Sequence, residues 1–206
     1  SPCQGFSFAG KQLNFDDPRS KLFFEFVRLK NEINPGFFIL ENVRMKQESQ
    51  DIISKYLGVE PVRFNSSLVS AQNRQRLFWT NIDFDLPDDK GIILADILED
   101  GVTDRAKSHC LDANYFKGGN LKSYFEKHRR QLVFKEFLKD DWPLLDHAKS
   151  KYLSHLSFRK LTPLECERLQ TVPDNYTNHV SNTQRYKMLG NGFTVDVVAH
   201  ILKGLH

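Results

Sequence analysis

The stretch Pro35-Gly36-Phe37-Phe38-Ile39-Leu40-Glu41-Asn42-Val43 decides the fold prediction. Its apolar run, residues 37–40, is short, as expected for a strand buried on both faces of a parallel sheet. Pro35 and Gly36 break the chain just before that run. Glu41 then follows at the carboxyl end of the strand, where ligands bind in open α/β sheets. The order predicts an α/β fold with a ligand site at this edge, although a lone carboxylate there is also compatible with a solvent-facing helix cap.

The segments around this strand continue the α/β pattern. Residues 20–33 place apolar side chains at helical spacing, and Asp16-Asp17-Pro18 before them is typical of a helix start. A second helix is predicted over residues 49–57, and two further strands over 62–69 and 76–82.

The chain divides into three predicted parts. Residues 1–83 form the α/β part. Residues 84–157 begin with residue types typical of loops, and their apolar residues show only weak periodicity. This pattern indicates an insertion and not a continuation of the sheet. Residues 158–206 return to helical patterns at 163–170 and 195–205.

The charge is unevenly distributed along the 206 residues. The net charge is only +3, yet residues 101–160 carry 13 Lys/Arg against 7 Asp/Glu, and the rest carries 16 against 19. Part of this basic segment, residues 121–138, is predicted to be a helix. Such a segment in a near-neutral protein indicates either an anionic partner or a solvated helix face.

Several classes of protein are excluded by composition. The three cysteines, Cys3, Cys110 and Cys166, are too few and too scattered for a disulfide framework or a zinc site, which fits a reducing cytoplasm. No apolar run approaches the ~20 residues of a membrane span, and no signal peptide opens the chain. Since Ser1 is not a methionine, we expect the chain to have been cut or processed upstream.

Two motifs carry residues suited to catalysis or substrate binding. Cys3 stands between Pro2 and Gln4 on a predicted sharp turn, where its thiolate is either an exposed nucleophile or an inert apolar side chain. In the second motif, Gln72, Arg74 and Arg76 alternate along an extended segment and are predicted to project together. Two guanidinium groups on one face can bind a phosphate or a base carbonyl. The alternative interpretation is that they lie at a solvated strand edge.

Two further motifs lie near the end of the chain. In residues 159–170, Thr162 is predicted to cap a helix that begins at Pro163, with Glu165 completing a capping box and Cys166 buried. The turn Gly190-Asn191-Gly192 is suited to close approach by a small ligand. It is too short for a dinucleotide fingerprint, and no G-x-G-x-x-G occurs in the chain.

In this order, the motifs resemble the series found in the DNA cytosine-5 methyltransferases, and the resemblance spans nearly the whole chain. It implies a partial, Rossmann-like methyltransferase sheet that binds S-adenosylmethionine, with a small target-recognition lobe at residues 84–157. Residues 112–120 are similar to the recognition loop of a subgroup that includes phage enzymes and animal de novo methyltransferases. The chain departs from the family at Thr171-Val172-Pro173, where Gly-Phe-Pro is usual. It also starts at the nucleophile turn, so we expect the first three strands and most of the cofactor pocket to be missing.

The resemblance implies a role for each motif. Cys3 would be the nucleophile that attacks cytosine C6, Glu41 would hydrogen-bond N3 and the exocyclic amine, and Arg74 and Arg76 would hold the base carbonyl and nearby backbone. The partner would be double-stranded DNA with its target base flipped out. The residues expected to line the cofactor pocket are Asn191, Gly192 and Phe193. The residues expected to contact DNA are Gln4, Gln72, Asn114, Lys117, Arg129 and Arg130.

The leading hypothesis is therefore the C-terminal portion of a DNA cytosine-5 methyltransferase, active only with a missing N-terminal cofactor-binding half. Three alternatives stay open: an inactive DNA-binding or regulatory remnant, one subunit of a split enzyme, and an RNA methyltransferase on the same scaffold. The expected location is on DNA in the cytoplasm of a bacterial or phage-infected cell, where methylation would serve restriction-modification or protection of phage DNA. No metal and no membrane are expected.

Overall fold

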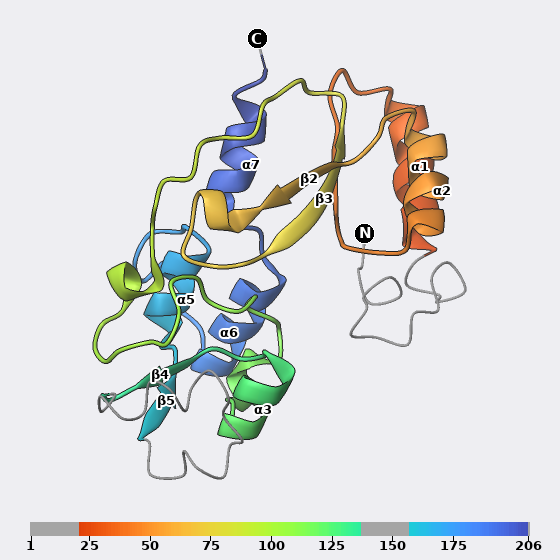
Figure 1. The fold of residues 1–206 in the computed structure, drawn as a ribbon. Helices are drawn as coiled ribbons and strands as arrows, with labels where there is room; N and C mark the ends of the chain where they lie inside the picture. Colours follow the sequence, from red (N-terminus) through yellow and green to blue (C-terminus); the bar gives the residue numbers. More distant parts are fainter. Residues whose placement is uncertain (1–20, 137–156, 206) are drawn as a thin grey trace. The chain divides into compact units, whose positions relative to one another are not determined.

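The structure, a computed structural model, describes residues 21–136 and 157–205. They fall into two units with separate cores (Figure 1). The first unit takes the chain up to residue 65, then 75–86, then 200 onward. The second takes residues 66–74 and 87–199. The prediction of three parts along the chain, 1–83, 84–157 and 158–206, stays a prediction.

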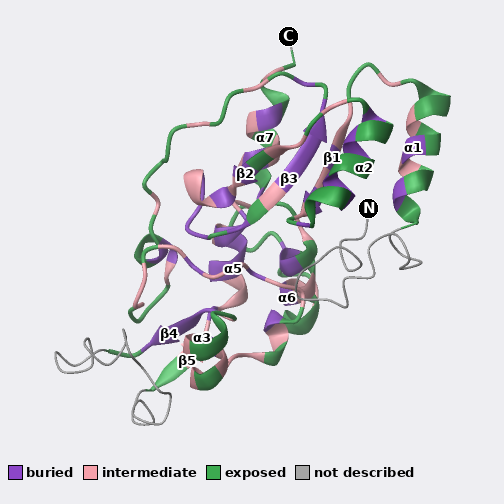
Figure 2. Ribbon diagram, turned by 45° about the vertical axis from the view of Figure 1, so that its right-hand side comes forward, coloured by how far each residue is buried: buried purple, intermediate pink, exposed green. Residues whose placement is uncertain are grey.

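The first unit is built on an antiparallel sheet of three strands in the order β1-β3-β2. The strands are β1 (Ile39–Val43), β2 (Val62–Asn65) and β3 (Gln75–Thr80). Helices α1 (Leu22–Ile33) and α2 (Gln47–Leu57) lie side by side on one side of these strands (Figure 2). Their shared core consists of Phe23, Val27, Leu40, Met45, Ile53, Leu57, Leu77 and Trp79.

The sheet corrects the prediction made from residues 37–40. The strand begins at Ile39 and runs through Glu41 to Val43, so the carboxylate lies inside the strand and not beyond its end. Burial alternates along it, with Leu40 and Asn42 buried and their neighbours half-buried. Its described partner, β3, runs antiparallel to it, and the local sequence pattern does not reveal the direction of a partner strand. The predicted strand 62–69 ends at Asn65 and continues as the short 3-10 helix η2 (Ser66–Leu68).

The second unit combines helices with a two-stranded antiparallel sheet. Its strands are β4 (Leu132–Phe134) and β5 (Phe158–Lys160), and its 3-10 helices are η3 (Leu94–Ile97) and η4 (Tyr115–Lys117). Its α-helices are α3 (Leu121–Lys127), α5 (Pro163–Leu169) and α6 (Asn182–Asn191). Helix α7 (Val195–Leu202) starts in this unit and ends in the first. Within the described residues, this small sheet is separate from the three-stranded one.

Two helix predictions in this unit need correction. The basic helix predicted over residues 121–138 ends at Lys127, because His128 adopts a left-handed conformation with φ 48° and caps it. The chain then turns into β4, and the predicted end at Leu138 lies outside the described residues. Helix α6 was not predicted, since its sequence is polar and buries only Tyr186, Leu189 and Gly190.

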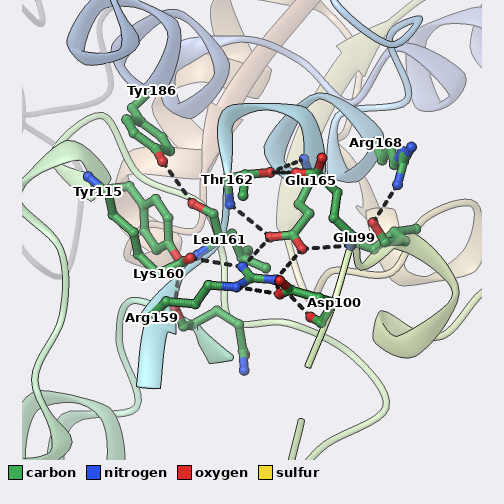
Figure 3. Close-up of polar contacts among 12 residues, drawn as sticks. Glu99, Asp100, Tyr115, Arg159, Lys160, Leu161, Thr162, Glu165, Arg168 and Tyr186 are labelled. Carbon is green, nitrogen blue, oxygen red and sulfur yellow. Dashed lines mark hydrogen bonds and ion pairs between the residues drawn. The ribbon is translucent and has the colours of Figure 1, made fainter. Parts of the chain in front are cut away.

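The start of α5 confirms its sequence prediction in detail (Figure 3). The Thr162 hydroxyl accepts a hydrogen bond from the Glu165 backbone N–H at 3.1 Å, and the Glu165 carboxylate accepts one from the Thr162 N–H at 2.8 Å. Glu165 is fully buried and receives two further bonds from the Arg159 guanidinium, each 2.8 Å long. Cys166 is fully buried as predicted, and burial raises the pKa of its thiol.

Candidate active site

The first unit brings together two of the predicted catalytic residues, Glu41 and Arg76. Arg76 Nε lies 2.8 Å from Glu41 Oε1. Glu41 is opposite Phe78 in the β1–β3 register, and Arg76 is two residues before Phe78, so the pair forms a diagonal contact on one face of the sheet. This face is opposite to the one that packs on α1 and α2, which carries Leu40, Leu77 and Trp79.

The Glu41–Arg76 ion pair is positioned but still accessible. The two side chains are 20% and 15% exposed, respectively. An aromatic group on the same face surrounds Phe64, which contacts the rings of Phe78, Phe84 and His200 with centroids 6.0–6.4 Å apart. A carboxylate can accept hydrogen bonds from a ligand, a guanidinium can donate them, and the neighbouring apolar surface can pack on a flat ring. The pair can therefore bind a flat polar ligand that has both donors and acceptors.

Gln72 and Arg74 belong to the second unit, where they clamp the backbone of one residue, Leu111, at its N–H and at its carbonyl. The Leu111 N–H donates to Gln72 Oε1 at 3.3 Å, and Arg74 Nη1 donates to the Leu111 carbonyl at 2.8 Å. Leu111 directly precedes residues 112–120, the predicted recognition loop. The clamp therefore fixes the point from which that loop starts.

The other end of the Arg74 guanidinium holds the glycine-rich turn. Nη2 donates to the Gly192 carbonyl at 2.9 Å and lies 3.4 Å from the Gly190 carbonyl. At 4% exposed, Arg74 is a positioning residue that ties the recognition loop to this turn. The direct contact of Arg74 with a base carbonyl stays a prediction, and in this structure the guanidinium contacts carbonyls of the protein itself.

Gln72 also departs from its predicted role. Its side chain is 0% exposed and donates to the Leu169 carbonyl at 2.8 Å and to Gln170 Oε1 at 3.1 Å. A side chain without exposed surface offers nothing to DNA, so Gln72 supports the scaffold in this structure. Gln72 and Arg74 belong to the second unit and Arg76 to the first, and the projection of the three side chains as one set stays a prediction.

Gly190 and Asn191, predicted to lie in a turn, form the end of α6, and the segment from there to Thr194 presents two of its predicted residues to the surface. Asn191 is exposed, and the Phe193 ring is 54% exposed. Beneath them, Thr194 Oγ1 donates to Gln170 Oε1 at 2.9 Å, and Gln170 Nε2 donates to the Leu189 carbonyl at 2.6 Å. Gln170 and Thr194 were not among the site residues predicted from the sequence. The one available signal was that Gln170 ends the Arg-Leu-Gln motif.

A glycine is required where α6 meets the recognition loop. A Cβ atom on Gly190 would lie 2.3 Å from the backbone carbon of Asp112 and 2.4 Å from the Ala113 nitrogen. The rings of Tyr115 and Tyr186 also meet here, edge to face, with centroids 5.7 Å apart. The loop and α6 thus form one packed assembly within the second unit.

The residues predicted to contact DNA differ in accessibility. Asn114, Lys117 and Arg129 are exposed, and Arg129 lies 3.6 Å from an Asp112 carboxylate oxygen. Arg130 is half-buried and donates to the Gly118 carbonyl at 2.8 Å. Cys3 and Gln4 lie outside the described residues.

A buried polar network stabilises the base of the recognition region. Arg105 Nη1 lies 2.8 Å from His109 Nε2, and Arg105 Nε donates to the Tyr124 hydroxyl at 2.9 Å. Since a guanidinium only donates, His109 Nε2 must accept and the ring is neutral. Burial and the Arg105 charge lower the pKa of His109 to about 4.

Two negative findings concern the described residues alone. They contain no cluster of histidine, cysteine or carboxylate side chains that could hold a metal ion. No helix among them has the length and apolar character needed to cross a membrane.

Comparison with known proteins identifies relatives along the whole chain. The sequence profile described as C-5 cytosine-specific DNA methylase matches residues 1–107 and 107–206. The type II methyltransferase M1.ScrFI of Lactococcus lactis subsp. cremoris is 32% identical over 96% of this chain and 58% of its own length. M2.ScrFI of the same organism is 30% identical over 99% of this chain and 64% of its own. The chain thus spans less than two thirds of these two relatives.

Solved structures agree on the fold. The Entamoeba histolytica methyltransferase EhMeth superposes with a TM-score of 0.65 at 17% identity, covering 99% of this chain and 74% of that one. The Schizosaccharomyces pombe Dnmt2 methyltransferase gives 0.60 at 16% identity, covering 92% and 74%. These matches show the methyltransferase fold, here in partial form. The chain belongs to the C-5 cytosine-specific DNA methylase family.

Proposed function

We propose that the protein is a DNA cytosine-5 methyltransferase, of which this chain carries the cytosine-binding and recognition parts. The observation that carries the proposal is the half-buried Glu41–Arg76 pair on one face of the sheet, in a chain of this family. The proposed substrate is double-stranded DNA, on which the protein would act in the cytoplasm.

In the proposed reaction, the Cys3 thiolate adds to C6 of a cytosine flipped out of the duplex. The Glu41 carboxyl group delivers a proton to N3, and its other oxygen accepts a hydrogen bond from the exocyclic amine, while the Arg76 guanidinium donates to the carbonyl oxygen. Both interactions offset the charge that develops as the bond to C6 forms, which makes C5 nucleophilic. After C5 is methylated, loss of its proton restores the ring and releases Cys3.

The methyl donor would be S-adenosylmethionine, which supplies an electrophilic methyl group when bound. The turn at Gly190–Thr194 fits one wall of such a pocket, because Arg74 fixes its backbone and the Phe193 ring is exposed beside it. The sequence lacks the glycine-rich strand-to-helix loop of a dinucleotide site, so we expect the rest of the pocket from a part of the protein beyond this chain.

Trapping with 5-fluorocytosine tests the proposal. Fluorine at C5 cannot leave as a proton does, so the full-length protein should remain covalently attached to a substituted duplex. We expect no adduct with Cys3→Ser, and a loss of about 100-fold or more in methyl transfer for Glu41→Gln, because an amide cannot deliver a proton to N3.

The outcomes also separate the alternatives. Methylation by Cys3→Ser would refute the mechanism. DNA binding without adduct or methyl transfer would favour the inactive remnant. Transfer to tRNA but not to duplex DNA would favour an RNA substrate. Activity only on mixing with a separately encoded partner would favour a split enzyme.

A further inference from the structure

Three lysines that are distant in sequence gather on one surface of the second unit. The Lys117 and Lys187 ammonium groups lie 5.7 Å and 5.3 Å from the centre of the same ring, Phe116. Lys160 Nζ donates to the Phe116 carbonyl at 3.1 Å and lies 4.5 Å from the centre of the Tyr186 ring. We call Lys117, Lys160 and Lys187 the lysine patch.

The three ammonium groups of the patch lie together without an acidic partner. None of its three ammonium groups forms an ion pair with a described residue. Several other cations of the unit are paired with carboxylates, among them Lys90 with Asp196, Arg159 with Glu165, Arg168 with Asp174 and Arg185 with Glu167. Like charges gathered without counter-charge raise the energy of the folded state. An anion that bound there would remove that cost.

The patch is also held by rigid structure. Phe116 and Lys117 belong to η4 in the recognition loop, Lys187 to α6 and Lys160 to β5. Gly190 keeps α6 directly against the loop backbone. The ammonium groups themselves lie over aromatic rings, and that of Lys160 is also hydrogen-bonded to a backbone carbonyl, so little side-chain freedom is lost on binding.

We propose that the lysine patch binds the phosphate backbone of duplex DNA and positions the recognition loop on it. The inference rests on the proposed function and assigns DNA contacts to Lys160 and Lys187, which lie outside the predicted recognition region, 84–157. Point charges spread over a surface suit a row of phosphates, since ammonium groups bind phosphate without needing a fixed planar geometry.

The test measures how DNA affinity depends on salt. Fluorescence anisotropy with a labelled duplex gives the slope of log K against log salt for the full chain. Each lost phosphate contact should reduce that slope by about 0.9, so Lys187→Gln should lower it by about 0.9 and Lys117→Gln with Lys187→Gln by about twice that. Lys187→Arg keeps the charge and should keep the slope.

Lys30→Gln is the matched control. Lys30 also lies over one ring, with its Nζ 4.9 Å from the centre of Phe38, but it belongs to the first unit and not to the patch. The proposal is overturned if the patch variants keep the wild-type slope, if Lys30→Gln lowers the slope as much, or if the patch binds phosphatidylserine vesicles and not DNA. Trapping of DNA by Cys3 is measured in a separate experiment. If the wild-type protein forms the adduct but the patch variants keep the wild-type salt slope, only the proposal for the patch is refuted. If the patch variants lower the slope but the wild-type protein forms no adduct, only the proposed methyltransferase function is refuted.

Discussion

Arg74 and Arg76 stand two residues apart in the sequence and do different things. Arg76 forms the partly exposed ion pair with Glu41, while buried Arg74 donates to carbonyls of two segments far along the chain. The planar fork of a guanidinium makes the second arrangement possible, and a lysine cannot reproduce it.

Arg74→Lys should therefore destabilise the protein by about 1–3 kcal/mol, because buried carbonyls lose their donors. Arg76→Lys is the comparison, and we expect a loss of no more than about 1 kcal/mol, as for other ion pairs near solvent. Urea denaturation measures both. Equal losses would contradict the assignment of Arg74 as the positioning residue.

His109 should make stability depend on pH. The folded ring has a pKa of about 4, against an ordinary value of about 6.5. Between these values the unfolded chain binds a proton that the folded chain does not, so stability is full above pH ~6.5 and falls as the pH approaches 4. In His109→Asn, the urea concentration at the midpoint of unfolding should change less with pH over this range. If it changes with pH as much as in the wild type, groups other than His109 cause the acid sensitivity.

At the scale of elements, α5 depends on its capping box. Thr162→Ala removes the acceptor for the Glu165 N–H and should cost about 1 kcal/mol in the free energy of unfolding. Thr162→Ser retains a hydroxyl and should recover most of that stability. An alanine variant as stable as wild type would mean that the Arg159–Glu165 pair alone holds the helix start.

The packing of α6 on the recognition loop makes Gly190 and Gly192 a contrasting pair. Gly190→Ala drives a Cβ into the Asp112–Ala113 backbone and should cost about 1–3 kcal/mol. Gly192→Ala brings a Cβ 3.1 Å from the Met188 carbonyl and 3.8 Å from the Leu189 carbonyl, and should cost less. The melting temperatures of the two variants show which substitution costs more stability. A lower melting temperature for Gly192→Ala would mean that the loop backbone moves to accommodate the new Cβ on α6.

Local pattern predicts elements well where periodicity is strong. It located α1, α2 and α5 to within about two residues, and the cap of α5 residue by residue. It missed α6, which buries only one turn of its surface, and extended α3 too far, because the left-handed conformation of His128 has no clear local signal. The strand order of the sheet depends on long-range pairing and could not be predicted in this way.

For the whole molecule, the two cores should respond separately to cavities. Ile53 and Leu169 are fully buried, one in each unit, and truncation of either to alanine should cost about 2–5 kcal/mol locally. Hydrogen exchange should show weaker protection in β3 for Ile53→Ala and in α5 for Leu169→Ala. Equal loss in both elements after either substitution would indicate one cooperative core.

The candidate site shows the same limit on prediction. The motif order identified Glu41 and Arg76, and the structure pairs them across two strands. The roles of Gln72 and Arg74 could not be read from their neighbours, because their partners, Leu169 and Gly192, lie about a hundred residues away. The lysine patch likewise joins residues that are scattered along the sequence.

The return of the chain to its first unit at residue 200 has a consequence for synthesis. His200 packs on Phe64, and Ile201 is fully buried, yet both are made about 120 residues after β3. At about 5–20 residues per second, the ribosome needs roughly 6–24 seconds to reach them. During that interval the aromatic side of the nascent sheet has no α7 to cover it. Chaperone capture or aggregation would therefore act on this protein mainly while it is being translated.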